Sequence, residues 1–113
     1  MSKKRIILID DAPFILNILK YNLEKEGYEV FTGANGEEGL QILEKIYPDL
    51  VLVDIMMPDM DGYTFVKRIR QNNNLKDLKV VFLTSLRSKD DVAKAVALGV
   101  KDYIMKPFTP QVV

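Results

Sequence analysis

The most informative segment of the sequence is Leu50-Val51-Leu52-Val53-Asp54-Ile55-Met56-Met57-Pro58-Asp59-Met60-Asp61-Gly62. It opens with branched apolar residues that follow one another without alternation, which is typical of a strand buried on both faces of a parallel sheet. Asp54 comes at the carboxyl end of that strand, and open α/β sheets bind their ligands at this edge. A turn-rich stretch follows, so this segment alone explains Asp54 equally well as a turn residue or as a functional carboxylate.

Strand-like and helix-like segments alternate along the whole chain. Besides the strand at residues 50–53, apolar runs predict strands at residues 5–9, 28–32, 79–83 and 101–105. Apolar residues at helical spacing, with capping and terminating residues, predict a helix at residues 13–26 and further helices after Asn35, Gly62 and Ser88. The alternation predicts an α/β fold with a parallel sheet and helices on both faces.

The first expected helix begins at Pro13 and is capped by Asp11 or its neighbour. Its apolar stripe consists of Ile15, Ile18, Leu19 and Leu23. Two aromatic residues, Phe14 and Tyr21, fall outside this stripe.

Three glycines follow the second strand. Gly33, Gly36 and Gly39 are spaced G-x-x-G-x-x-G, which differs from the G-x-G-x-x-G spacing of dinucleotide-binding turns. We therefore interpret them as turn glycines and expect no dinucleotide site.

The amino-acid composition limits the kinds of chemistry that the chain can carry out. The 113 residues predict a single domain, residues 1–113, and the 48% hydrophobic and 28% charged residues are typical of a soluble globular protein. Sixteen basic and sixteen acidic residues give zero formal net charge, so we expect no direct binding of nucleic acid or membrane. The chain has no cysteine and no histidine, which excludes thiol nucleophiles, imidazole bases and His-ligated zinc and is compatible with the cytoplasm.

Chemically useful side chains follow four of the five expected strands. They are Asp10 and Asp11, Asp54, Thr84 with Ser85, and Lys106. Taken singly, they are explained as a helix cap, a turn residue or a surface lysine, but in a parallel sheet all these ends lie on one edge. Three carboxylates repel each other unless a cation is bound, and Mg²⁺ suits an all-oxygen site that is completed by phosphate, with Mn²⁺ as an alternative. Asp54 is then the natural nucleophile, and Thr84 and Lys106 can hold phosphoryl oxygens.

The whole set of motifs resembles the receiver domain of two-component response regulators, the CheY-like family. The matching positions are Asp10-Asp11, Asp54 with Met57-Pro58 and Asp61-Gly62, Thr84-Ser85, and Asp102-Tyr103 with Lys106-Pro107-Phe108. The resemblance implies a flavodoxin-like, doubly wound, five-stranded sheet in the order 2-1-3-4-5. It also implies transfer of a phosphoryl group to Asp54 from a phosphohistidine on a sensor histidine kinase or phosphotransfer protein.

The resemblance also implies a role for each matched residue. Asp10, Asp11 and Asp54, helped by the backbone carbonyl of Met56, bind Mg²⁺. Thr84 and Lys106 bind the phosphoryl group, and Tyr103 turns inward as Thr84 moves toward the phosphate. Phe14, Pro107 and Phe108 are expected at the surface where the kinase docks; scattered surface aromatics are the alternative explanation for Phe14.

Two apolar residues predict a long-lived phosphorylated state. Met56 and Leu86 stand two positions after Asp54 and Thr84, and neither side chain can orient an attacking water. We expect a signalling switch with slow self-dephosphorylation, not an enzyme with turnover. A haloacid-dehalogenase-like phosphatase would need an aspartate at the position of Met56, and the remaining alternative is a binding module that is not phosphorylated.

The end of the chain is abrupt. Thr109-Pro110 resembles the start of a fifth helix, but the sequence stops at Val113, so this helix is truncated. We expect a fragment of a longer regulator, with an effector domain beyond the C-terminus; a stand-alone receiver is the alternative. Activated receivers of the family often pair through the fourth helix, fifth strand and fifth helix, so the short last helix leaves homodimer formation open.

Overall fold

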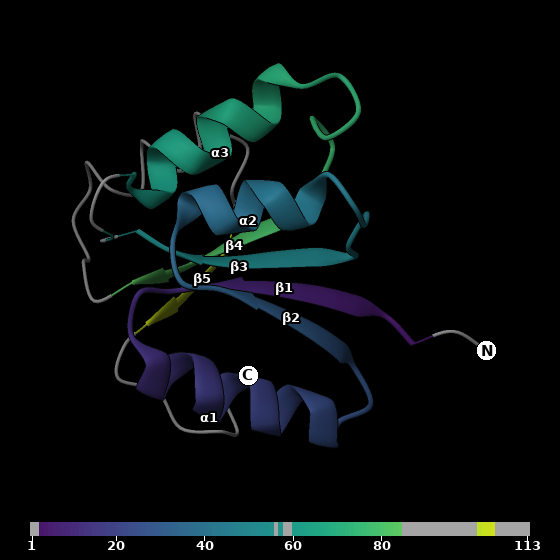
Figure 1. Ribbon diagram of the computed structural model, residues 1–113, viewed down its shortest axis with the longest axis vertical. Coiled ribbons are helices and arrows are strands. Elements are labelled where there is room, and N and C mark those ends of the chain that lie inside the picture. The colour runs from purple at the N-terminus through teal and green to yellow at the C-terminus, as the bar shows by residue number, and fades with distance from the viewer. Residues whose placement is uncertain (1–2, 56, 58–59, 85–101, 106–113) are drawn as a thin grey trace.

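The centre of the structure is a parallel sheet of five strands in the order β2-β1-β3-β4-β5 (Figure 1). This computed structural model describes residues 3–55, 57, 60–84 and 102–105. In chain order the elements are β1 (Arg5–Ile9), α1 (Pro13–Lys25), β2 (Glu29–Gly33), α2 (Gly36–Leu43), β3 (Leu50–Asp54), α3 (Gly62–Gln71), β4 (Val80–Thr84) and β5 (Asp102–Met105). The predicted α/β class and strand order are confirmed. The helices expected after Ser88 and at Thr109 lie outside the described residues.

The helices cover both faces of the sheet. Figure 1 shows α1 on one face and α2 with α3 on the other. Successive residues of β1 alternate between the two layers: Ile6 and Leu8 pack with α1, whereas Ile7 and Ile9 pack with α2 and α3. A strand with a core on each side needs apolar residues at every position, which explains the continuous apolar runs in the sequence.

Helix α1 begins and ends close to the predicted residues. Pro13 is in its first turn, and its N-cap is Ala12, which supplies no capping side chain. The carboxylate of Asp10 accepts a hydrogen bond from the Ala12 amide at 2.9 Å and so fixes the turn that leads into the helix. Beyond the C-terminus, Gly27 has φ of 98°, a conformation that favours glycine.

The buried stripe of α1 differs from the predicted one. Its buried residues are Leu16, Leu19 and Leu23, and Leu16 was missing from the prediction. Ile15 and Ile18 are only partly buried. Phe14 and Tyr21 are 71% and 66% exposed, in agreement with their position outside the stripe.

None of the three predicted turn glycines lies in a turn, since Gly33 is the last residue of β2 and the other two belong to α2. Asn35 caps α2 as expected, because its side-chain oxygen accepts from the Glu38 amide at 2.9 Å. Gly36 is the first residue of α2 and Gly39 lies inside the helix. A Cβ at Gly39 would collide with side-chain atoms of Ile9 and Phe65, so this glycine lets α2 approach the sheet and α3 closely.

Helix α3 is capped by Asp61, whose carboxylate accepts from the Thr64 amide at 2.8 Å. The predicted core residues Phe65, Val66 and Ile69 are fully buried. None of the helices in the part of the chain that the structure describes is long and apolar enough to span a membrane.

An arginine closes the connection between α3 and β4. Arg70 donates from Nη1 to the carbonyl oxygens of Lys76 at 2.9 Å and Leu78 at 2.6 Å. Burial lowers the pKa of the Arg70 guanidinium, and electrostatic interactions with Asp77 and Tyr47 oppose this shift. The guanidinium remains charged under all ordinary conditions, so both hydrogen bonds are charge-assisted.

Candidate functional site

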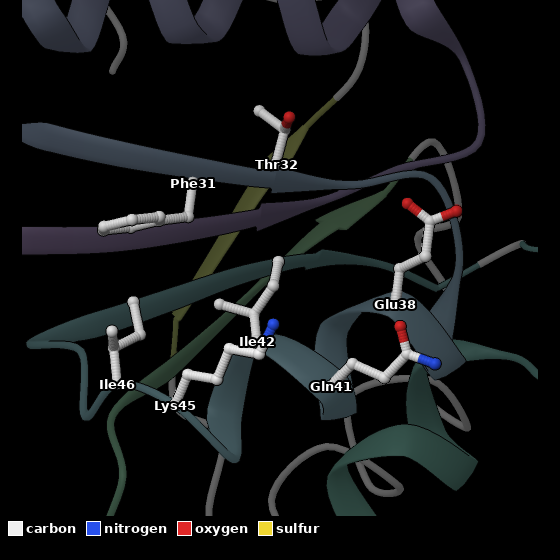
Figure 2. Close-up of a pocket in the computed structure, with 7 residues that line it drawn as sticks. All are labelled: Phe31, Thr32, Glu38, Gln41, Ile42, Lys45 and Ile46. Carbon is white, nitrogen blue, oxygen red and sulfur yellow. The ribbon is translucent and has the colours of Figure 1, made fainter.

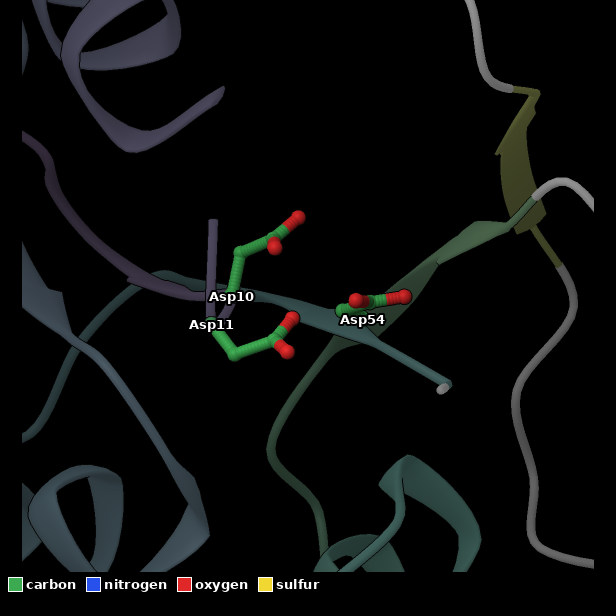
Figure 3. Close-up of side chains that lie close together, drawn as sticks. All are labelled: Asp10, Asp11 and Asp54. Carbon is green, nitrogen blue, oxygen red and sulfur yellow. The ribbon is translucent and has the colours of Figure 1, made fainter. Parts of the chain in front are cut away.

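Three carboxylates meet at the carboxyl edge of the sheet. Asp10 and Asp11 follow β1 and Asp54 ends β3, and one oxygen from each lies within 4.8 Å of the others (Figure 3). The register brings them together, because Ile9 pairs with Val53 and the next residues of the two strands are therefore level. The predicted convergence of these three side chains is confirmed.

The three side chains differ in their exposure to solvent. Asp10 is fully buried and Asp54 is 5% exposed, whereas Asp11 is exposed. One oxygen of Asp10 accepts the amide hydrogen of Ala12. In Figure 3 the Asp11 side chain extends toward Asp54. The cluster is thus open to solvent at Asp11 and enclosed by protein at its other two members.

The backbone around Asp54 is held on two sides. The Ile55 amide donates to the carbonyl oxygen of Leu83 on β4 at 3.2 Å, and the Gly62 amide donates to the carbonyl oxygen of Ile55 at 2.9 Å. The first bond extends the pairing of β3 with β4, and the second joins the strand end to the start of α3. These bonds fix the direction in which the Asp54 side chain leaves the strand.

The set of donors suits a small, hard divalent cation. Three carboxylates that lie this close repel one another, and two of them are shielded from water. Mg²⁺ prefers oxygen ligands, uses one or two carboxylates and completes its shell with water or phosphate oxygens. The solvent access at Asp11 leaves room for such ligands.

The remaining predicted site residues are described in part or not at all. Thr84 is the last residue of β4, and Asp54 pairs with its neighbour Leu83. Tyr103 lies on β5 and pairs with Phe82 of β4. The backbone thus places Thr84 on the strand next to that of Asp54 and Tyr103 one strand further along the sheet. The side chains of Thr84 and Tyr103 lie outside the described part of the structure. So do the residues Met56, Leu86, Lys106, Pro107 and Phe108.

A shallow hollow between β2 and α2 was not predicted from the sequence. It has a volume of about 270 Å³ and is lined by Phe31, Thr32, Glu38, Gln41, Ile42, Lys45 and Ile46 (Figure 2). Its one carboxylate, that of Glu38, already accepts the amide hydrogen of Ala34 at 3.1 Å as part of the cap of α2. The carboxylate cluster, where three acids from two strand ends converge, is the better candidate site.

The packing role of Gly62 was not predicted from the sequence. Gly62 is the first residue of α3 and lies directly against the backbone of Asp54 and Ile55. The signal available in the sequence was the pair Asp61-Gly62, a capping residue followed by the smallest residue at a helix start.

Comparisons with known proteins agree with this geometry. The family model of the response regulator receiver domain matches residues 6–113. The chain is 40% identical over 111 residues to the probable transcriptional regulator ycf27 of Cyanophora paradoxa, covering 98% of this chain and 45% of that protein. It is 38% identical over 108 residues to the alkaline phosphatase synthesis transcriptional regulatory protein PhoP of Bacillus subtilis, covering 96% of this chain and 44% of that protein. The chain thus spans less than half the length of these two relatives.

Solved structures give the same result. The chemotaxis protein CheY4 of Vibrio cholerae superimposes with a TM-score of 0.94 at 31% identity, covering 98% of this chain and 92% of that one. A family match over nearly the whole sequence, the strand order and the acidic cluster at the sheet edge agree with one another. The chain belongs to the response regulator receiver domain family of two-component signalling systems.

Proposed function

We propose that Asp54 is the phosphoacceptor of this receiver domain and that its donor is a phosphohistidine on a sensor histidine kinase or phosphotransfer protein. In this reaction a carboxylate oxygen of Asp54 forms a bond to phosphorus, and the phosphorus–nitrogen bond of the donor breaks. The electron pair of that bond goes to the imidazole, which takes a proton from water. The observation that carries the proposal is the approach of three carboxylates at the strand ends.

Asp10, Asp11 and Asp54, with the backbone carbonyl of Met56, would hold Mg²⁺ or Mn²⁺. Bound there, the cation neutralises the charge that the carboxylates and the incoming phosphoryl oxygens bring together. The buried position of Asp10 and Asp54 supports this assignment, because neither charge has full access to water. Asp54 would attack the phosphorus, and Asp10 and Asp11 would hold the cation.

Thr84 and Lys106 would bind the remaining phosphoryl oxygens, and Thr84 with Tyr103 would carry the conformational switch. The positions of Thr84 at the end of β4 and of Tyr103 on β5 support this proposal. Phosphoryl transfer needs positioning and charge neutralisation above all, and these side chains supply both. The chain then acts as a switch that catalyses its own phosphorylation and slow dephosphorylation, without turnover of an external substrate.

The partners follow from the same proposal. A kinase would dock over the exposed Phe14 on α1 and over Pro107 and Phe108. Because the two relatives are named as transcriptional regulators and are more than twice as long, we propose that this receiver controls an effector domain in a longer cytoplasmic protein. A homodimer of the activated form is compatible with such an architecture.

Intact-mass measurement tests the assignment of Asp54. The protein is incubated with Mg²⁺ and acetyl phosphate, and we expect a stable gain of one phosphoryl group that is absent in Asp54→Asn. Asp49→Asn is the matched control, because Asp49 is an exposed aspartate that precedes the same strand. Continuous release of phosphate would indicate a phosphatase, and an unchanged mass would indicate a binding module that is not phosphorylated.

A further inference from the structure

Gly62 packs directly on the backbone that carries Asp54. A Cβ built on Gly62 would lie 2.6 Å from the carbonyl oxygen of Asp54 and 2.9 Å from the Cα of Ile55. Both distances are shorter than any normal contact of a Cβ atom. The amide of Gly62 also donates to the carbonyl oxygen of Ile55 at 2.9 Å. The first residue of α3 therefore rests against the peptide that links Asp54 to Ile55.

The close approach of the Asp54–Ile55 backbone explains why residue 62 is a glycine. Its own backbone conformation does not require one. Among the described residues the glycine with positive φ is Gly27, so the φ of Gly62 is open to any L-residue. Only the missing side chain lets α3 begin at this distance from β3.

The atoms around Gly62 have little freedom to move away. Gly36 offers a comparison, because a Cβ there would meet the side chain of Met60, which is flexible and can turn aside. At Gly62 the nearest atoms belong to the backbone. Helix α3 itself is anchored by Phe65, Val66 and Ile69, each of them fully buried. An added methyl group would therefore push on the Asp54–Ile55 peptide at the end of the strand.

We propose that Gly62 is a positioning residue that fixes the Asp54 carboxylate at the right place relative to Asp10 and Asp11. The proposal rests on the proposed metal and phosphoryl site at Asp54. A shifted Asp54–Ile55 peptide turns the Asp54 side chain, because the side chain leaves the same Cα. Groups that orient metal ligands without touching the metal often control affinity strongly.

The test compares Gly62→Ala with Gly27→Ala. Both variants add one methyl group, but Gly27 has open space around it and its substitution strains only the backbone, far from the site. The Mg²⁺ dissociation constant of each protein is measured by an NMR titration without phosphodonor. We expect Gly62→Ala to weaken Mg²⁺ binding by about tenfold or more, with chemical shift changes centred on the Asp54 and Ile55 amides. We expect Gly27→Ala to stay within about twofold of wild type, because distant sites act independently.

A folded Gly62→Ala protein with wild-type Mg²⁺ affinity would overturn the proposal, and so would an equal loss in Gly27→Ala. If Gly62→Ala does not fold, the pair Asp61→Ala and Asp61→Asn replaces it. Asp61 caps the first turn of α3 through the Thr64 amide, and asparagine keeps this cap whereas alanine removes it. Both variants lose the same charge, so weaker Mg²⁺ binding in Asp61→Ala than in Asp61→Asn supports positioning by the helix start. Equal affinities overturn it.

These readouts separate this inference from the proposed function. If wild-type protein binds Mg²⁺ but gains no phosphoryl group, the phosphoacceptor assignment of Asp54 is wrong and the positioning role of Gly62 is unaffected. Wild-type protein that is phosphorylated on Asp54, together with unchanged Mg²⁺ affinity in Gly62→Ala, would remove only the positioning role.

Discussion

Asp11, which follows β1, and Asp54, which ends β3, bring carboxylate oxygens within 4.8 Å of each other. Asp11 is exposed to solvent, whereas Asp54 is only 5% exposed. Two like charges at this distance destabilise the fold that brings them together. A bound cation turns this destabilisation into a stabilisation of the fold. It binds the folded protein, whereas the unfolded chain has no assembled site for it. The stability of this protein is therefore expected to respond to Mg²⁺.

Mg²⁺ at ten times its dissociation constant should stabilise the wild-type protein by about 1.4 kcal/mol. Thermal unfolding should then show a melting temperature about 5 °C higher than without the metal. Asp11→Asn relieves repulsion and should raise stability without metal by roughly 0.5–1 kcal/mol, while losing most of the response to Mg²⁺. Glu44→Gln, at an exposed carboxylate at the end of α2, should keep the wild-type response. A full Mg²⁺ response in Asp11→Asn would contradict the predicted ligand set.

Removing the guanidinium of Arg70 should destabilise the fold, because two carbonyl oxygens lose a charged donor. We expect Arg70→Ala to lower the free energy of unfolding by about 2–3 kcal/mol, measured by urea denaturation. Arg68→Ala is the matched control on the same helix. Arg68 forms an ion pair with Glu37 at 3.4 Å in which both side chains are more than half exposed, and its loss should cost under about 1 kcal/mol. Equal costs for the two variants would show that the Arg70 bonds contribute no more than a surface pair.

Adding a methyl group inside α2 should affect stability to different extents at its two glycines. Gly39→Ala forces a Cβ against Ile9 and Phe65, two well-packed side chains, and should lower stability by about 1–3 kcal/mol. Gly36→Ala meets the flexible end of Met60, and the better helix propensity of alanine offsets part of the crowding, so its change should stay below about 1 kcal/mol. Urea unfolding of both variants checks the ranking. A stabilised Gly39→Ala protein would show that α2 moves away from the sheet easily.

The lifetime of the phosphorylated protein should depend on Met56 and Leu86. Replacing both with polar residues that can orient water should speed loss of the phosphoryl group by roughly tenfold, a small part of what a positioned acid–base group can contribute. The decay of the phosphorylated mass after removal of the phosphodonor measures this rate. Exchange of both residues for other apolar side chains is the control and should leave the rate near that of wild type. An unchanged lifetime in the polar variant would refute the prediction.

Phe14→Ala should slow phosphorylation by a sensor kinase and leave stability almost unchanged, because the side chain is 71% exposed. Tyr21→Ala is the matched control, an aromatic residue on the same helix that is 66% exposed. If Phe14 contributes to docking, its loss should weaken binding of the kinase by about 1–2 kcal/mol. Phosphorylation by acetyl phosphate should be the same in both variants. Similar kinase rates for Phe14→Ala and Tyr21→Ala would remove the special role of Phe14.

The elements of this fold were predictable because each strand is an apolar run between turn signals. Boundaries shifted by one residue at β2 and β4, where flanking residues can join either the strand or the turn. The stripe of α1 was partly wrong because Phe14, Ile15, Leu16, Ile18 and Leu19 make that helix apolar almost all round. Periodicity alone does not say which of these side chains faces the sheet.

The acidic cluster was predictable because the carboxyl ends of parallel strands share one edge. The close contacts of Gly39 and Gly62 were not, since the sequence does not show which atoms a glycine in the first turns of a helix will meet. The pair Asp61-Gly62 indicates a helix start but not the contact with Asp54. The hydrogen bonds of Arg70 were not predictable either, because a backbone carbonyl acceptor has no signature in the sequence.

The pairing of Ile9 with Val53 joins segments that are remote along the chain, and the acidic cluster exists only once β1 and β3 have met in this register. A slip by one residue would turn every β1 side chain to the opposite face and separate Asp10 from Asp54. The proposed metal site therefore forms only in a correctly assembled sheet. A misfolded chain would lack the proposed phosphoacceptor site and would give no signal.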